Sequence, residues 1–135
     1  MTLSTVPYAL AVDDDPFILM DVCRILEDAG YRCHEADDGD GALVLLSSKA
    51  DQIMLLFSDV EIPGSIDGFE LTRRVSKLYP WIDIVIASGN ITPKPGDMPE
   101  RATFLSKPFS AHIVHEHLRN TLPEGKKPEP LREES

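Results

Sequence analysis

Short apolar runs alternate with longer amphipathic stretches along the chain. Five runs have the length and composition of buried strands, and they cover residues 8–12, 31–36, 53–57, 83–87 and 103–105. Apolar residues recur at helical spacing in the intervening and final stretches, which predicts helices over about 15–29, 40–48, 69–78 and 110–122. Apolar strands that alternate with helices are typical of a parallel sheet covered on both faces. The pattern therefore predicts an α/β fold.

Two segments depart from this alternation. Residues 90–100 contain Pro93, Pro95 and Pro99, and prolines at this density are incompatible with a regular helix. We expect a short or irregular connection there. Residues 123–135 contain one large apolar side chain among prolines and charges, which predicts a disordered tail. The expected folded domain is therefore 6–122.

Composition narrows the classes of function. The 135-residue chain has a net charge of -10, which argues against direct nucleic-acid binding because that needs lysine and arginine against phosphates. Residues 1–12 do not form a signal peptide, and no apolar run is long enough to cross a membrane, so we expect a cytoplasmic protein without membrane insertion.

Cys23 and Cys33 lack metal-ligand spacing and are expected to be reduced, partly buried thiols. His112, His115 and His117 are interpreted as surface histidines.

Chemically useful side chains follow four of the predicted strands. Asp13, Asp14 and Asp15 follow the first strand, Asp59 the third, Ser88 the fourth and Lys107 the fifth. Ligands of open parallel sheets bind beyond the carboxyl ends of the strands, where these residues converge. Clustered carboxylates repel one another, and a hard dication such as Mg²⁺ relieves that conflict with oxygen ligands. A carboxylate can also attack phosphorus to form an aspartyl phosphate, whose oxygens an ammonium and a hydroxyl would stabilise.

Five motifs in order carry a resemblance to a known family. They are residues 11–16 (AVDDDP), 58–64 (SDVEIPG), 67–68 (DG), 86–89 (IASG) and 104–109 (FLSKPF). With these motifs the chain resembles the receiver domain of two-component response regulators over roughly residues 6–122. The resemblance implies a flavodoxin-like, doubly wound sheet of five parallel strands in the order 2-1-3-4-5.

The resemblance also implies a role for each motif residue. Asp59 corresponds to the phosphoacceptor, and Ser88 and Lys107 to the hydroxyl and lysine that pair with the phosphoryl group. Ser88 and Phe104 lie where the family has its switch residues. Asp15 is expected to cap the first helix. The implied Mg²⁺ ligands are Asp13, Asp14, Asp59 and the backbone carbonyl of Glu61.

The sequence departs from the family pattern at three places, of which the first is not expected to move Asp59 and the other two concern signal output. The loop after Pro63 is one residue longer than the common form, and Phe104 lacks the hydroxyl of a switching tyrosine. The proline-rich segment 90–100 replaces the usual fourth helix, which many relatives use for output or dimerisation. The sequence therefore leaves open whether the protein forms a homodimer.

The implied function is acceptance of a phosphoryl group on Asp59 from a histidine kinase or a histidine phosphotransfer protein. Phosphorylation would then switch binding of a protein partner or relay the phosphoryl group. We expect self-phosphorylation and autodephosphorylation with Mg²⁺, without an independent substrate, and we expect Glu61→Ala to change the dephosphorylation rate several-fold. The alternatives are a phosphorylation-independent interaction module, a haloacid-dehalogenase-type phosphatase, and a receiver detached from a hybrid kinase.

Overall fold

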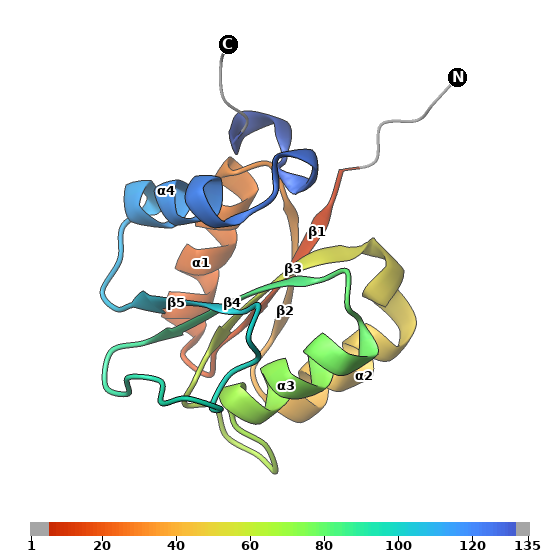
Figure 1. Ribbon diagram of the computed structural model, residues 1–135, viewed down its shortest axis with the longest axis vertical. Helices are drawn as coiled ribbons and strands as arrows, with labels where there is room; N and C mark the ends of the chain where they lie inside the picture. The colour runs from red at the N-terminus through yellow and green to blue at the C-terminus, as the bar shows by residue number, and fades with distance from the viewer. Residues whose placement is uncertain (1–5, 132–135) are drawn as a thin grey trace.

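The computed structural model describes residues 6–131 and contains one parallel sheet of five strands. The strands lie in the order β2-β1-β3-β4-β5, which confirms the predicted flavodoxin-like topology (Figure 1). The chain moves outward from β1 to β2 and then crosses to the other side of β1. The switch in strand order therefore lies at β1 and β3, where ligands bind in this type of sheet. The strands are β1 (Tyr8–Val12), β2 (Arg32–Ala36), β3 (Ile53–Asp59), β4 (Asp83–Ser88) and β5 (Thr103–Ser106).

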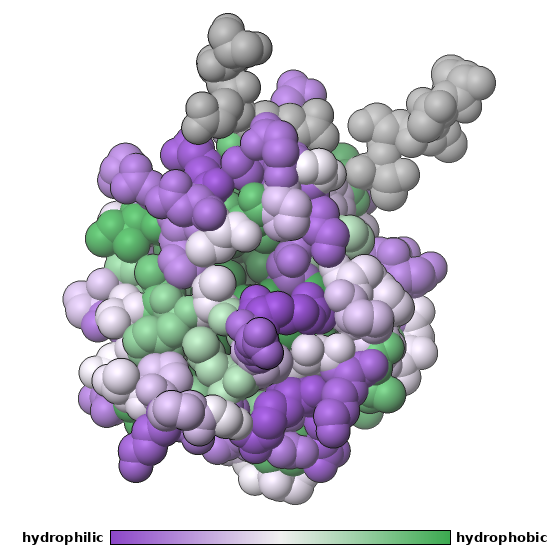
Figure 2. Space-filling view, in the orientation of Figure 1, coloured by the Kyte–Doolittle hydropathy of each residue, from purple (hydrophilic) through white to green (hydrophobic). Residues whose placement is uncertain are grey.

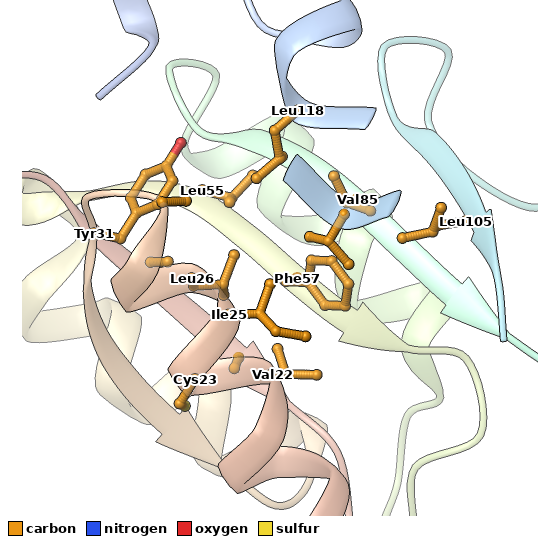
Figure 3. Packing of buried hydrophobic residues seen from close by; sticks show 14 of the residues in the cluster. Val22, Cys23, Ile25, Leu26, Tyr31, Leu55, Phe57, Val85, Leu105 and Leu118 are labelled. Carbon is orange, nitrogen blue, oxygen red and sulfur yellow. The ribbon is translucent and has the colours of Figure 1, made fainter. Parts of the chain in front are cut away.

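Two pairs of helices cover the two faces of the sheet. Helices α1 (Pro16–Asp28) and α4 (Ala111–Thr121) pack on one face, and α2 (Gly39–Lys49) and α3 (Gly68–Leu78) on the other (Figure 1). Figure 3 shows the interface of α1 and α4 with the sheet, where Leu26 of α1, Leu118 of α4 and Phe57 of β3 belong to one apolar cluster. These strands are apolar on both sides because both sides are covered.

Side chains at the helix starts fix where the helices begin. The Asp15 carboxylate accepts hydrogen bonds from Phe17 N (2.9 Å) and Ile18 N (3.3 Å), so its predicted capping role is confirmed. The Ser110 hydroxyl caps α4 by accepting a hydrogen bond from Ile113 N at 3.2 Å. The first of these caps places α1 directly after the acidic loop of β1.

The connection between β4 and β5 is irregular, as the prolines predict. Among the residues described, no helix lies between these two strands. The segment is fixed to α3 by Arg73, whose guanidinium donates a hydrogen bond to the backbone carbonyl of Asp97. The Asp97 carboxylate in turn accepts a hydrogen bond from Lys94 N at 2.8 Å. Side-chain contacts thus replace helical hydrogen bonds in holding this segment.

The predicted disorder of the tail is wrong for residues 123–131, which we call the C-terminal segment. Leu131 is 1% exposed and joins the apolar cluster between α1, α4 and the sheet. Lys126 Nζ donates to the Trp81 carbonyl at 2.7 Å and lies 3.6 Å from the Asp83 carboxylate. The composition is poor in apolar residues, but one buried leucine and one anchored lysine hold the segment. Residues 132–135 of the predicted tail lie outside the described residues.

The histidines and cysteines lie partly in the interior. His112 is exposed, but His115 and His117 are half-buried, so the surface interpretation is wrong for these two. His115 Nε2 lies 2.8 Å from the Ile25 carbonyl, and His117 Nε2 lies 2.8 Å from Thr103 Oγ1. Both cysteines are free, as predicted, and Cys23 is buried on α1 (Figure 3).

Within residues 6–131, no helix is long and apolar enough to cross a bilayer.

Candidate functional site

Three carboxylates from two strand ends form an acidic pocket. Asp13 and Asp14 follow β1, and Asp59 is the last residue of β3, the neighbouring strand. Each offers an oxygen, and these oxygens lie within 4.8 Å of one another. Asp13 and Asp59 are only 5% and 9% exposed, whereas Asp14 is exposed. The pocket therefore has a buried base and one side open to solvent.

Lys107 joins the two buried carboxylates. Its Nζ lies 3.1 Å from Asp13 Oδ2 and 3.2 Å from Asp59 Oδ1. The lysine follows β5, which is two strands away from β3, so its side chain reaches back across the end of β4. One ammonium thus serves two carboxylates, and the predicted strand-end residues Asp13, Asp14, Asp59 and Lys107 do meet.

The pKa values in the pocket follow from burial and shared charge. Burial raises the pKa of the Asp59 carboxyl, and the charges of Asp13 and Glu61 add to this, while Lys107 opposes it; the net shift is upward. Burial lowers the pKa of the Lys107 ammonium, but Asp13 and Asp59 outweigh it and the pKa rises. Lys107 therefore stays protonated, whereas the Asp59 anion is only partly compensated. This leaves a local deficit of positive charge beside Asp59.

Gly68 is a positioning residue, although the sequence marks it only as part of the Asp67-Gly68 motif. Its backbone N donates to the Val60 carbonyl at 2.8 Å. A Cβ on Gly68 would lie 2.1 Å from the backbone oxygen of Asp59, so the start of α3 can approach β3 only if this residue has no side chain. The signal was the Asp67-Gly68 pair at a helix start, but the sequence does not show what the glycine approaches.

The remaining predicted site residues lie around the pocket in different ways. The Ser88 hydroxyl, 2% exposed, accepts hydrogen bonds from Asn90 N (3.2 Å) and Ile91 N (3.0 Å) and so shapes the turn after β4. Glu61 is exposed, and its Oε1 accepts a hydrogen bond from Asn90 Nδ2 at 3.2 Å. Phe104 is half-buried beside a small apolar cluster on the α3 side. Within residues 6–131, none of these three side chains has a hydrogen bond to Asp59 or Lys107.

Comparison with known proteins identifies the family. Residues 9–119 match the family described as "Response regulator receiver domain". The chain belongs to this family. Receiver domains are signalling modules that work with histidine kinases, and they are not enzymes with substrates of their own.

Curated relatives of this receiver domain include proteins of very different length. It is 36% identical over 120 residues to the nitrogen assimilation regulatory protein NtrX of Azorhizobium caulinodans, a match that covers 84% of this chain and 26% of NtrX. It is 32% identical over 122 residues to the response regulator receiver protein CpdR of Brucella abortus, covering 87% of this chain and 92% of CpdR. The chain thus spans about a quarter of NtrX but nearly all of CpdR.

Solved structures agree with the fold. The chemotaxis response regulator CheY4 of Vibrio cholerae superposes with a TM-score of 0.75 at 29% identity, covering 87% of this receiver domain and 100% of CheY4. The signal receiver domain of an HD domain-containing protein from Pseudomonas fluorescens also gives a TM-score of 0.75, at 27% identity and 93% coverage of both chains.

The acidic pocket fits the divalent cation expected of a receiver domain. Its three carboxylates provide hard oxygen donors, and the exposed side at Asp14 leaves room for water ligands, which Mg²⁺ usually retains. The negative charge of Asp59 is only partly balanced by Lys107, and a bound cation would balance the remainder. This triad is typical of the receiver-domain Mg²⁺ site.

Proposed function

We propose that this receiver domain accepts a phosphoryl group on Asp59 from a histidine kinase or a histidine phosphotransfer protein. The observation that carries the proposal is the convergence of Asp59, Asp13, Asp14 and Lys107 at the switch in strand order. An Asp59 oxygen attacks the phosphorus of a phosphohistidine. The P–O bond forms as the P–N bond breaks, and the imidazole leaves and takes up a proton.

Each neighbouring group has a role in this reaction. Asp13, Asp14, Asp59 and the Glu61 carbonyl would hold Mg²⁺, which when bound neutralises charge on the phosphoryl oxygens. The Lys107 ammonium already lies 3.2 Å from Asp59 and would pair with the phosphoryl group. The Ser88 oxygen accepts two backbone hydrogen bonds and keeps its own proton to donate. Phe104 is proposed as a switch residue that responds through packing.

The proposed output is binding of a protein partner or onward transfer of the phosphoryl group. Phosphorylation adds roughly -1.5 to -2 charges at one site, judged from other phosphorylated residues. Drawing Ser88 and Lys107 toward that charge would shift the loops after β4 and β5 between two states. The folded unit that carries this change is residues 6–122 together with the C-terminal segment.

Mass spectrometry with acetyl phosphate tests the acceptor. Wild-type protein should gain one phosphoryl group in the presence of Mg²⁺, and removal of Mg²⁺ with a chelator should abolish the gain. Asp59→Asn should not gain it, because the amide is not a nucleophile of comparable strength. Asp51→Asn is the matched control: it removes an exposed acid outside the pocket and should be labelled like the wild type.

Two results would decide against the proposal. Unlabelled wild-type protein under conditions that phosphorylate another receiver domain would remove the acceptor role. Equal labelling of Asp59→Asn would place the acceptor elsewhere. The rival interaction module is tested separately, since it requires that a partner bind phosphorylated and unphosphorylated protein equally well.

A further inference from the structure

Two cysteines that have no part in the proposed phosphorylation lie side by side between α1 and β2. Cys23 projects from α1 and Cys33 from β2, ten positions later in the chain, and their Sγ atoms are 2.8 Å apart. Both are free thiols and pack against the apolar cluster between α1 and the sheet. A disulfide bond is about 2.05 Å long, so the two sulfur atoms need to approach by less than 1 Å to form one.

The two sulfur atoms differ in access to solvent. Cys23 is 6% exposed and belongs to the buried face of α1. Cys33 is only partly buried, and its strand is the edge of the sheet, with no strand beyond it among residues 6–131. Of the two residues, Cys33 is therefore the one that we expect a dissolved reagent to reach first. This asymmetry is the arrangement required of an attacking thiol and a second thiol that resolves its adduct.

We propose that Cys23 and Cys33 form a reversible redox site that closes to an intramolecular disulfide when it reacts with a small-molecule disulfide such as oxidised glutathione. The Cys33 thiolate attacks one reagent sulfur, which forms a mixed disulfide and releases one reagent thiolate. Cys23 then loses its proton to water, attacks Cys33 Sγ and displaces the second reagent thiolate. Two protein thiols lose two electrons and two protons in total, and the reagent disulfide is reduced to two thiols.

The environment of Cys23 explains why the second step follows the first. The hydrogen bond with Cys33 is the largest cause that raises the pKa of Cys23, ahead of burial and the nearby Glu35 carboxylate. In the mixed disulfide Cys33 has neither a thiol nor a thiolate, so its hydrogen bond with Cys23 is lost. Cys23 then lies within bonding reach of the sulfur that it must attack. The inference stands on the sulfur geometry and does not rest on phosphorylation of Asp59.

Mass spectrometry of the native 135-residue chain tests the site directly. After equilibration with excess oxidised glutathione and acid quenching, wild-type protein should lose two hydrogen atoms and yield a peptide that joins Cys23 to Cys33. Cys23→Ala should stop at one glutathionyl adduct on Cys33, because no thiol is present to resolve it. Cys33→Ser, which keeps a side chain of similar size over Cys23, should remain unmodified until it is unfolded in urea, because Cys23 is 6% exposed in the folded domain.

Thermal unfolding of the wild type gives a second measurement that needs no variant. The disulfide would close a short loop, and oxidised protein should unfold about 5–10 °C above reduced protein. Dithiothreitol should reverse the shift. Two free thiols at equilibrium, a stable glutathione adduct on wild-type Cys33, or a disulfide between two chains would each overturn the proposal.

Discussion

At the scale of single residues, Gly68 controls how closely α3 approaches the end of β3. Its missing side chain leaves space that the Asp59 backbone oxygen occupies, 2.1 Å from where a Cβ would lie, and Val60 Cα lies at 2.8 Å. Neither contact can be relieved by a side-chain rotation, since both atoms belong to the backbone. The position of the Asp59 carboxylate therefore depends on a residue that has no functional group.

Gly68→Ala is expected to lower the free energy of unfolding by about 3 kcal/mol, because α3 or the end of β3 has to move. Urea unfolding followed by circular dichroism measures the change. Gly125→Ala is the control, since nothing lies within 4 Å of its Cβ position, and it should change stability by less than about 0.5 kcal/mol. A similar small change for Gly68→Ala would contradict the close approach.

The sequence predicted most of the pocket because strand ends in a parallel sheet share an edge. Asp13, Asp59 and Lys107 each follow an apolar run, so their meeting follows from topology. The orientation of the Ser88 hydroxyl toward Asn90 N was not predictable, because it depends on the path of a loop. Likewise, the approach of two sulfur atoms ten positions apart depends on how α1 lies over β2.

At the scale of elements, the β4–β5 connection depends on α3 for its shape. Arg73 forms an ion pair with Glu70 at 2.9 Å and also bonds the Asp97 carbonyl, whereas Arg74 bonds only Glu70 among these groups. Figure 2 shows a strongly hydrophilic surface over α3, in keeping with these side chains. One arginine on that surface therefore anchors a segment that lacks helical hydrogen bonds.

Arg73→Ala is expected to cost about 1 kcal/mol of stability and to increase protease cleavage between residues 91 and 99. Limited proteolysis with mass spectrometry locates the cleavage, and urea unfolding gives the stability change. Arg74→Ala is the control, because Arg74 is similarly exposed and also pairs with Glu70 but forms no bond with the Asp97 carbonyl. It should cost at most about 0.5 kcal/mol and cause no new cleavage. Equal behaviour of the two variants would argue against the anchor.

Element positions were predictable to within one or two residues in most cases. The alternation of apolar strands and amphipathic helices predicted these positions, and residues of the types that cap helices, Asp15 and Ser110, stand where two of the helices begin. Prolines alone predicted the irregular segment 90–100. What held the segment in place was not predictable, because Arg73 and Asp97 are separated by a whole strand.

At the scale of the whole molecule, the C-terminal segment covers the turn between α1 and β2. Pro128 and Pro130 lie over Gly30, where a Cβ would come within 2.7 Å and 2.8 Å of them. Leu131 completes the apolar cluster below. Composition predicted disorder because it averages over the segment, whereas a few specific contacts, those of Leu131, Lys126 and the two prolines, hold it on the domain.

Leu131→Ala is expected to lower the free energy of unfolding by about 2 kcal/mol, at the lower end for a buried leucine because a terminal segment can detach locally. Val44→Ala serves as the comparison, since Val44 is 72% exposed on α2 and its truncation should have little effect. Chemical denaturation of both variants measures the difference. Identical unfolding curves would show that the segment adds nothing to stability.

The ion pairs of Lys107 have a consequence for folding. Lys107 is 94 positions from Asp13 along the chain, so the pocket closes only after residues near the two ends of the domain have met. Contacts of such long sequence separation form at a high cost in loop entropy and tend to be completed late. A chain that has not yet added β5 would hold Asp13 and Asp59 together without their shared cation. The arrangement that the proposed phosphoryl transfer requires is therefore expected to form as one of the last events of folding.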